Sequence, residues 1–269
     1  MKIRKPVVAG SFYYFDKDNL KNQLSRLFLG VSRKRKCKAV ISPHAGYLYS
    51  GKTAAHAISS MGDFKDFIIL GPNHTGLGEI FSIMSSGKWQ TPLGYCEINS
   101  ELAESIKECG FVKDDFFAHV EEHSIEVQLP FLQYMFGNFR FVPICIMNVS
   151  FSEGFMKECI ALGDHIAKII KDKNIGLIAS SDFSHYLPRE VAKRKDEAAI
   201  EAIKELSVKK FFDVLRKEEA SICGFGPIAV VMTAAEKLKL KPKVIHASDS
   251  GDVTGDVSSV VSYYAIGFE

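Results

Sequence analysis

The chain has 269 residues, of which 46% are hydrophobic and 25% are charged, and its formal net charge is +2. These values are typical of a globular protein, and we expect one domain over residues 1–269. The low net charge argues against nucleic acid as a partner, and no apolar run reaches the roughly 18 residues of a membrane span.

Apolar residues recur at helical or strand spacing along the whole chain. In chain order, the pattern predicts helix 18–29, strand 39–41, helix 51–61, strands 66–70 and 80–84, helices 100–109 and 122–136, strand 141–146, helix 153–172, strand 175–179, helices 190–205 and 225–238, and strands 244–247 and 257–266. Continuously apolar strands that alternate with helices are typical of an α/β fold. We therefore expect a mainly parallel, mixed sheet that is flanked by helices.

Polar residues follow three of these predicted strands. His44 follows the first strand, His74 the second, and Asp182 and His185 the one at 175–179. In open α/β sheets the ligand crevice lies at the carboxyl ends of the strands, where the loops converge. We therefore expect these four side chains to lie close together in one polar cleft.

Each of these residues has a functional and a structural interpretation. His44 and His74 follow proline-bearing turns that suit metal ligands, although either could simply donate to a carbonyl group. Asp182 lies three residues before His185, so its carboxylate could orient that imidazole for acid–base catalysis. Alternatively, Asp182 binds backbone amides and leaves His185 as an exposed bystander.

Two further residues are candidates for the same cleft. His123, with Glu126, is predicted at the start of a helix and could face inward or lie at the surface. Cys223 precedes a helix among glycines, where a helix dipole can lower the pKa of a thiol for metal binding or nucleophilic attack. With His185 and Asp182, Cys223 would form the triad of a hydrolase.

The remaining sequence features favour a protein of the cytoplasm. The six cysteines are widely spaced and form no CxxC pair, which fits a reducing compartment. No secretory signal is evident in residues 1–18. The basic run Arg33–Lys36 is interpreted as a solvated loop before a strand.

Residues Gly46–Thr53 match the G-x-x-x-x-G-K-[ST] pattern of a phosphate-binding loop. Such a loop needs small residues where its amides curl around phosphate, but Tyr47, Leu48 and Tyr49 occupy those positions. A second strand with a magnesium-binding carboxylate is also not evident. We therefore do not expect a nucleotide triphosphatase.

Six segments taken together resemble the Memo family. They are Val8–Tyr13, Pro43–Tyr47, Gly71–His74, Glu122–Glu126, Ser181–His185 and Ile222–Gly224. The stretch from His44 to Gly51 is similar to a characteristic stretch of that family, which accounts for the match to the phosphate-binding loop.

The Memo family is similar in fold to the class III extradiol (LigB-type) dioxygenases, which bind Fe(II) through two histidines and a carboxylate. The resemblance therefore implies an extradiol-dioxygenase-like subunit. By position, it implies metal ligands at His44, His74 and Cys223, and acid–base roles for His185, Asp182 and His123. Cys223 stands where those dioxygenases have the carboxylate. Because a thiolate is a softer ligand, it favours copper, zinc or electron-rich iron and argues against ring cleavage.

The function that we expect is a metal-dependent redox role, with Fe(II), copper or zinc, on an unknown substrate. The alternatives are an adaptor that binds a peptide or small molecule in the cleft without catalysis, and the cysteine hydrolase. The resemblance also implies pathway partners among AMMECR1-like and radical-SAM proteins.

Overall fold

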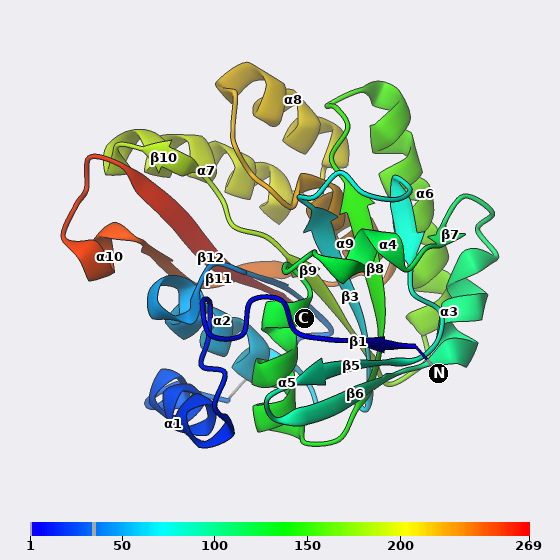
Figure 1. The fold of residues 1–269 in the computed structure, drawn as a ribbon. Helices are drawn as coiled ribbons and strands as arrows, with labels where there is room; N and C mark the ends of the chain where they lie inside the picture. The colour runs from blue at the N-terminus through cyan, green and yellow to red at the C-terminus, as the bar shows by residue number, and fades with distance from the viewer. Residues whose placement is uncertain (1, 34–35) are drawn as a thin grey trace.

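A large β-sheet runs through the structure, and helices cover both of its faces (Figure 1). This computed structural model describes residues 2–33 and 36–269, so Lys34 and Arg35 of the basic run lie outside the described residues. The strands are β1 (Ile3–Arg4), β2 (Ala39–Ser42), β3 (Asp66–Asn73), β4 (Phe81–Ile83), β5 (Lys88–Thr91), β6 (Gly94–Ile98), β7 (Lys113–Asp114), β8 (Arg140–Met147), β9 (Ile175–Ser180), β10 (His185–Leu187), β11 (Pro242–Asp249) and β12 (Val260–Phe268). The helices are α1 (Lys17–Phe28), α2 (Tyr47–Ser60), α3 (Ser100–Lys107), α4 (Phe117–Val120), α5 (Leu129–Phe136), α6 (Glu153–Ile170), α7 (Arg189–Lys204), α8 (Val208–Glu218), α9 (Phe225–Lys237) and α10 (Gly251–Thr254).

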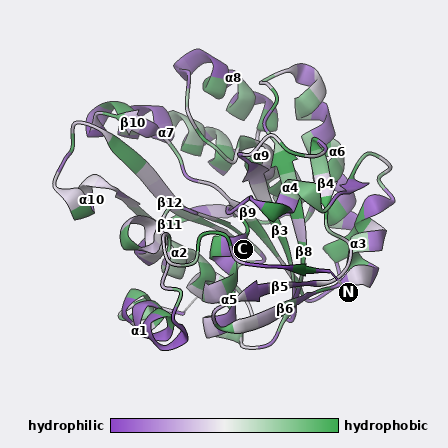
Figure 2. Cartoon of the chain, viewed as in Figure 1, coloured by the Kyte–Doolittle hydropathy of each residue, from purple (hydrophilic) through white to green (hydrophobic). Residues whose placement is uncertain are grey.

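The centre of the sheet consists of four parallel strands in the order β8, β3, β9 and β2. β12 extends the sheet antiparallel to β2, and β11 pairs antiparallel with β12. Figure 2 shows hydrophobic residues concentrated on the central strands, as expected for strands that helices cover on both sides. The predicted α/β fold, with a mainly parallel mixed sheet flanked by helices, is confirmed.

Alternate side chains of β3 enter two different apolar clusters. Ile68 and Leu70 pack with residues of α3, α6, α7, α8 and α9. Phe67 and Ile69 pack with residues of α1, α2 and α5. The same sheet therefore supports the core on both sides and holds the chain together as a single domain.

Some predicted elements differ from the structure. The helix predicted at 122–136 is wrong in its first part, because residues 122–125 form a loop, Glu126–Gln128 a 3-10 turn, and α5 begins only at Leu129. α2 begins at Tyr47, so most of the Gly46–Thr53 stretch is helical and offers no loop for phosphate. The β5–β6 hairpin and α8 were not predicted. The signal for α8 was present, since Val208, Phe211, Phe212 and Leu215 have helical spacing and are buried.

Membrane-spanning helices were not expected from the sequence. Within residues 2–33 and 36–269, no helix combines the length and the apolar character that crossing a membrane requires.

A buried ion pair anchors the N-terminal segment to the loop that precedes α5. The Arg4 guanidinium contacts the Glu126 carboxylate, and the two side chains are 1% and 0% exposed. Arg4 also lies over the Trp89 ring, 4.4 Å from its centroid. Glu126 accepts hydrogen bonds from the Val7 amide at 2.9 Å and the Tyr13 hydroxyl at 2.6 Å. One carboxylate therefore holds both ends of the segment from Arg4 to Tyr13.

We predict that Glu126→Gln strongly destabilises the protein, because it leaves the Arg4 charge buried without its partner. The expected loss in free energy of unfolding is about 3–5 kcal/mol, measured by urea denaturation. Glu121→Gln, at an exposed position in the same loop, is the matched control and should change stability by less than about 0.5 kcal/mol. Equal stabilities of the two variants would contradict this role of Glu126.

Candidate metal centre

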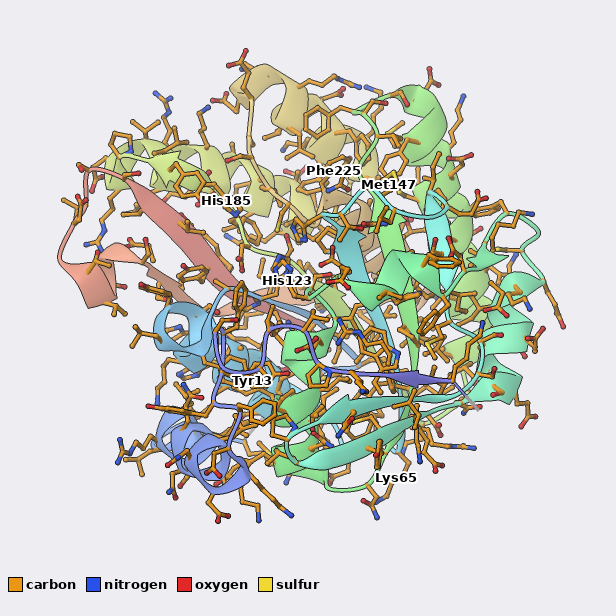
Figure 3. The ribbon with its side chains drawn as sticks, viewed as in Figure 1. Tyr13, Lys65, His123, Met147, His185 and Phe225 are labelled. Carbon is orange, nitrogen blue, oxygen red and sulfur yellow. The ribbon has the colours of Figure 1, made fainter. Side chains whose placement is uncertain are left out.

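Three of the predicted site residues follow the carboxyl ends of parallel strands. His44 follows β2, His74 follows β3 directly, and Asp182 lies two residues beyond β9. Cys223 comes from another part of the chain and stands two residues before α9. Figure 3 shows His123 at this end of the sheet and Lys65 at the opposite end. The prediction that strand ends gather these residues is therefore correct in geometry.

The ring of His44 is held by a serine at the end of β9. The Ser180 hydroxyl donates to the Ser124 carbonyl at 2.6 Å, so its lone pairs are left to accept from other groups. His44 Nδ1 lies 3.0 Å from this oxygen and must therefore carry a proton. The pKa of His44 is lowered well below its ordinary value by burial and by the neighbouring His74 and His123. The neutral ring then has its free lone pair on Nε2.

The ring of His74 is held by a buried carboxylate. Its Nδ1 lies 3.0 Å from Glu122 Oε1, and its own backbone amide donates to Glu122 Oε2 at 2.5 Å. Burial disfavours a charge on His74, but the hydrogen bond and the charge of Glu122 outweigh it and raise the pKa. Burial likewise opposes ionisation of Glu122, yet the contacts with His74 lower its pKa to about 2. Glu122 is therefore ionised, and Nε2 is the nitrogen of His74 that remains for a ligand.

The Cys223 thiol lies beside the free nitrogen of His44. Its Sγ is 3.2 Å from His44 Nε2 and also accepts a hydrogen bond from the Asp182 amide at 3.2 Å. Burial, and then the charge of Asp182, raises the pKa of this thiol well above its ordinary value. In the protein without a metal, desolvation therefore opposes the lowering that the start of α9 could produce. A thiolate at this position needs a cation beside it.

These three residues form a donor set that suits a transition metal. One ligand atom each from His44, His74 and Cys223 lies within 4.8 Å of the other two. A tetrahedral ion with ordinary bond lengths separates a nitrogen and a sulfur ligand by roughly 3.5 Å, close to the spacing of His44 and Cys223. In both imidazoles Nδ1 is hydrogen-bonded to a protein side chain, which leaves Nε2 for a metal, as is common in metal-binding histidines. The residues present therefore fit a metal ion.

His123 lies beside this donor set rather than at the start of a helix. Its ring stacks on His74, with centroids 4.9 Å apart, and Phe12 contacts it edge-on at 4.9 Å. Its Nδ1 is 3.5 Å from Glu122 Oε1. Burial lowers the pKa of His123. The charge of Glu122 opposes this shift, and the charge of His74 adds to it. Glu126 is also buried, but it binds the N-terminal segment.

Of the two interpretations of Asp182, its contacts match the one in which it binds backbone amides rather than the His185 ring. Asp182 Oδ1 accepts from the backbone amide of His44 at 2.8 Å and from that of Ala45 at 3.4 Å, so it holds the loop after β2. His185 Nδ1 instead lies 2.8 Å from the Ser221 carbonyl. His185 is still near enough for its charge to influence the pKa values of His44 and Asp182. The orientation of its ring depends on Ser221 rather than on Asp182.

Sequence reasoning missed several residues that position the centre. They are Glu122, Ser180, Ser221 and Asn148, whose amide donates to the Cys223 carbonyl. Glu122 carried a signal, since it lies next to His123 within a segment that was already a candidate. Ser180 and Ser221 contact residues far away in the sequence, which local spacing cannot reveal.

Glu122→Gln should lower the pKa of His74 in the metal-free protein. Without the carboxylate, burial becomes the main influence, so the pKa should fall below the ordinary value of 6.5. The measurement is an NMR titration of the imidazole nitrogens in protein treated with a chelator. Glu121→Gln is the control and should leave the His74 titration unchanged; a pKa that stays raised in Glu122→Gln would disprove the pairing.

Comparisons with a family model and with related sequences point to the same family. The family model described as Memo-like protein matches residues 4–267. A MEMO1 family protein from Sulfurisphaera tokodaii is 44% identical over 286 residues, covering 99% of each chain. One from Methanosarcina barkeri is 42% identical, covering 98% of this chain and 99% of its own, and one from Aquifex aeolicus is 40% identical over the whole of both chains.

A solved structure of an uncharacterized protein from Escherichia coli K12 has a similar fold. Its TM-score is 0.56 at 10% sequence identity, and the match covers 86% of this chain and 99% of that one. This likeness concerns the fold alone, and the expected similarity to extradiol dioxygenases stays a prediction. The match of the family model over nearly all residues, together with these relatives, shows that the chain belongs to the Memo family.

Proposed function

We propose that this chain binds a transition metal ion through His44, His74 and Cys223 and uses it in a redox reaction on a small molecule. The observation that supports the proposal best is the hydrogen bonding of the two histidines. Ser180 and Glu122 each engage Nδ1, which leaves both Nε2 atoms for the same place as the Cys223 thiol. Fe(II), copper and zinc are the ions that two imidazoles and a thiolate favour.

When bound, such an ion supplies a Lewis acid or an electron-transfer centre with positions open to a substrate. The protein side chains control access to the ion and transfer protons. Access is from the side of His74 and His123, whose side chains are 36% and 23% exposed, because His44 is almost fully buried. Phe12, at the edge of His123, gives this side an apolar wall.

His185 is suited to accept a proton from a bound molecule. Its Nδ1 is 2.8 Å from the Ser221 carbonyl, which can only accept, so the neutral ring carries its proton there. The lone pair then lies on Nε2, as a general base requires. His123 is a second candidate for proton transfer, and Asp182 positions the backbone at His44.

We predict that the protein, reconstituted without oxygen, retains about one equivalent of Fe(II), Cu(I) or Zn(II) after dialysis. His44→Ala, His74→Ala and Cys223→Ser should each weaken binding at least about tenfold, since each removes a ligand. Metal content by mass spectrometry measures the stoichiometry. Anomalous scattering at the iron, copper and zinc edges would identify the ion and its position.

Two variants serve as matched controls for this experiment. Cys109→Ser and His165→Ala change residues of the same types at half-buried positions outside the centre. Both should bind metal like the unchanged chain. If the ligand variants retain as much metal as these controls, the proposal fails.

A hydrolase with Cys223 as nucleophile is the second candidate, because His44 Nε2 lies 3.2 Å from its Sγ. In this arrangement His44, not His185, is the base. The raised pKa of Cys223 argues against a reactive thiolate at neutral pH.

We expect Cys223 to react with iodoacetamide no faster than Cys109 at neutral pH, because its burial keeps the thiol protonated. Peptide mapping by mass spectrometry would follow the labelling of each cysteine over time. Labelling of Cys223 that is faster than that of Cys109, and that slows in His44→Ala, would favour the hydrolase. Bound metal should protect Cys223 and leave Cys109 unaffected.

A further inference from the structure

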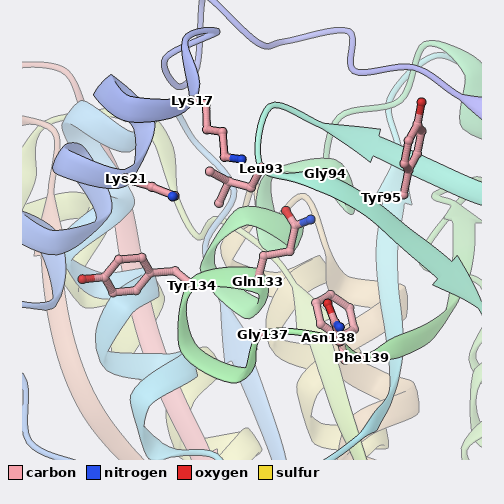
Figure 4. Close-up of a pocket in the computed structure, with 10 residues that line it drawn as sticks. All are labelled: Lys17, Lys21, Leu93, Gly94, Tyr95, Gln133, Tyr134, Gly137, Asn138 and Phe139. Atoms are coloured by element: carbon pink, nitrogen blue, oxygen red, sulfur yellow. The ribbon is translucent and has the colours of Figure 1, made fainter.

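A second polar hollow lies at the opposite end of the sheet from the metal centre. It is bounded by α1, α5 and the turn between β5 and β6, and its volume is about 470 Å³ (Figure 4). Asn138 and Phe139, which line it, precede the amino end of β8. Because β8 runs parallel to β3, this end is the one remote from His74. A hollow of this size can hold a small organic molecule.

Two lysines place positive charge in this hollow. Lys17 and Lys21 are one helical turn apart on α1, and Figure 4 shows both ammonium groups extending from the helix toward α5 and the turn. Among the described residues no carboxylate lines the hollow, and neither lysine forms an ion pair there. Like charges four residues apart on a helix repel each other. An anion with several oxygens would remove this repulsion and bind both ammonium groups.

An exposed aromatic ring stands at the other end of the hollow. Tyr95 is 52% exposed and also lines an adjacent hollow of about 490 Å³. The ammonium group of Lys88 lies 4.1 Å from the centroid of its ring. The adjacent hollow adds further cationic side chains and one carboxylate; these are Lys65, Lys88, Arg140 and Glu97. Arg140 forms an ion pair with Asp66, but Lys65 and Lys88 outnumber Glu97, so the region keeps a net positive charge and offers a ring for stacking.

Side-chain amides lie between the lysines and the tyrosine. Gln133 Oε1 accepts from the Thr91 hydroxyl at 2.6 Å, which fixes the amide and leaves its Nε2 as a free donor. Asn138 adds a second, exposed amide to the lining. Such amides can bind the hydroxyl groups of a sugar or the polar edge of a base.

We propose that this hollow binds a nucleotide, with its phosphates on Lys17 and Lys21 and its base against Tyr95. The lysines, the side-chain amides and the tyrosine follow one another along the hollow, in the same order as the phosphates, the sugar and the base of a nucleotide. The binding site is separate from the metal centre and does not depend on the function proposed for it.

Isothermal titration calorimetry with ADP, AMP and pyrophosphate at low salt tests this proposal. ADP should bind more tightly than pyrophosphate, because only ADP can stack on Tyr95. The double variant Lys17→Gln/Lys21→Gln should weaken ADP binding at least about tenfold. Tyr95→Ala should weaken it at least about fivefold, whereas Tyr95→Phe should retain it, since stacking needs the ring alone.

Two controls make the outcome decisive. Lys171→Gln/Lys217→Gln removes two exposed lysines that do not line the hollow and should leave the affinity unchanged. His74→Ala should also have no effect, because the metal centre lies at the other end of the sheet. Equal affinities for ADP and pyrophosphate, unchanged binding in Lys17→Gln/Lys21→Gln, or lost binding in His74→Ala would each overturn the proposal.

Discussion

The geometry of the candidate centre depends on the hydrogen bonds that the buried carboxylate of Glu122 accepts. This carboxylate is ionised, fully buried, and accepts from the His74 ring and from the backbone amides of His74, His123 and Ser124. A buried charge is tolerated only when it is paired and hydrogen-bonded, and here the partners are parts of the centre itself. The same contacts that stabilise the carboxylate therefore set the direction of His74.

The loop that contains Glu122 connects the centre with the rest of the molecule. Glu126, four residues later, holds the N-terminal segment through Arg4 and Tyr13. Between them, the Ser124 carbonyl accepts from Ser180 and thereby determines which nitrogen of His44 carries the proton. Residues 122–126 thus position both His44 and His74, the two histidines of the proposed metal site. These residues form a loop where their apolar spacing predicts a helix, since the His123 and Ser124 amides donate to the Glu122 side chain instead of to helix carbonyls.

The sequence predicted the fold and the gathering of the site because both follow from local patterns. Apolar runs with polar residues at their ends identify buried strands, and the topology of α/β sheets brings those ends together. The partners of each side chain depend on distant contacts instead. Asp182 and His185 are neighbours in sequence, yet Asp182 binds the loop of His44 and His185 binds Ser221. Spacing could place these groups in one cleft but could not assign their hydrogen bonds.

The N-terminal segment borders the exposed side of the centre. His44 is only 3% exposed, whereas His74 and His123 give the centre an open side. Phe12 borders that side through its contact with His123, and its carbonyl accepts from the amide of Tyr47 at the start of α2. The segment that carries Phe12 is held in turn by Glu126. The position of Phe12 and the orientation of His74 therefore depend on two carboxylates of the same short loop. A shift of this loop would alter both the open side of the centre and the direction of the His74 ring.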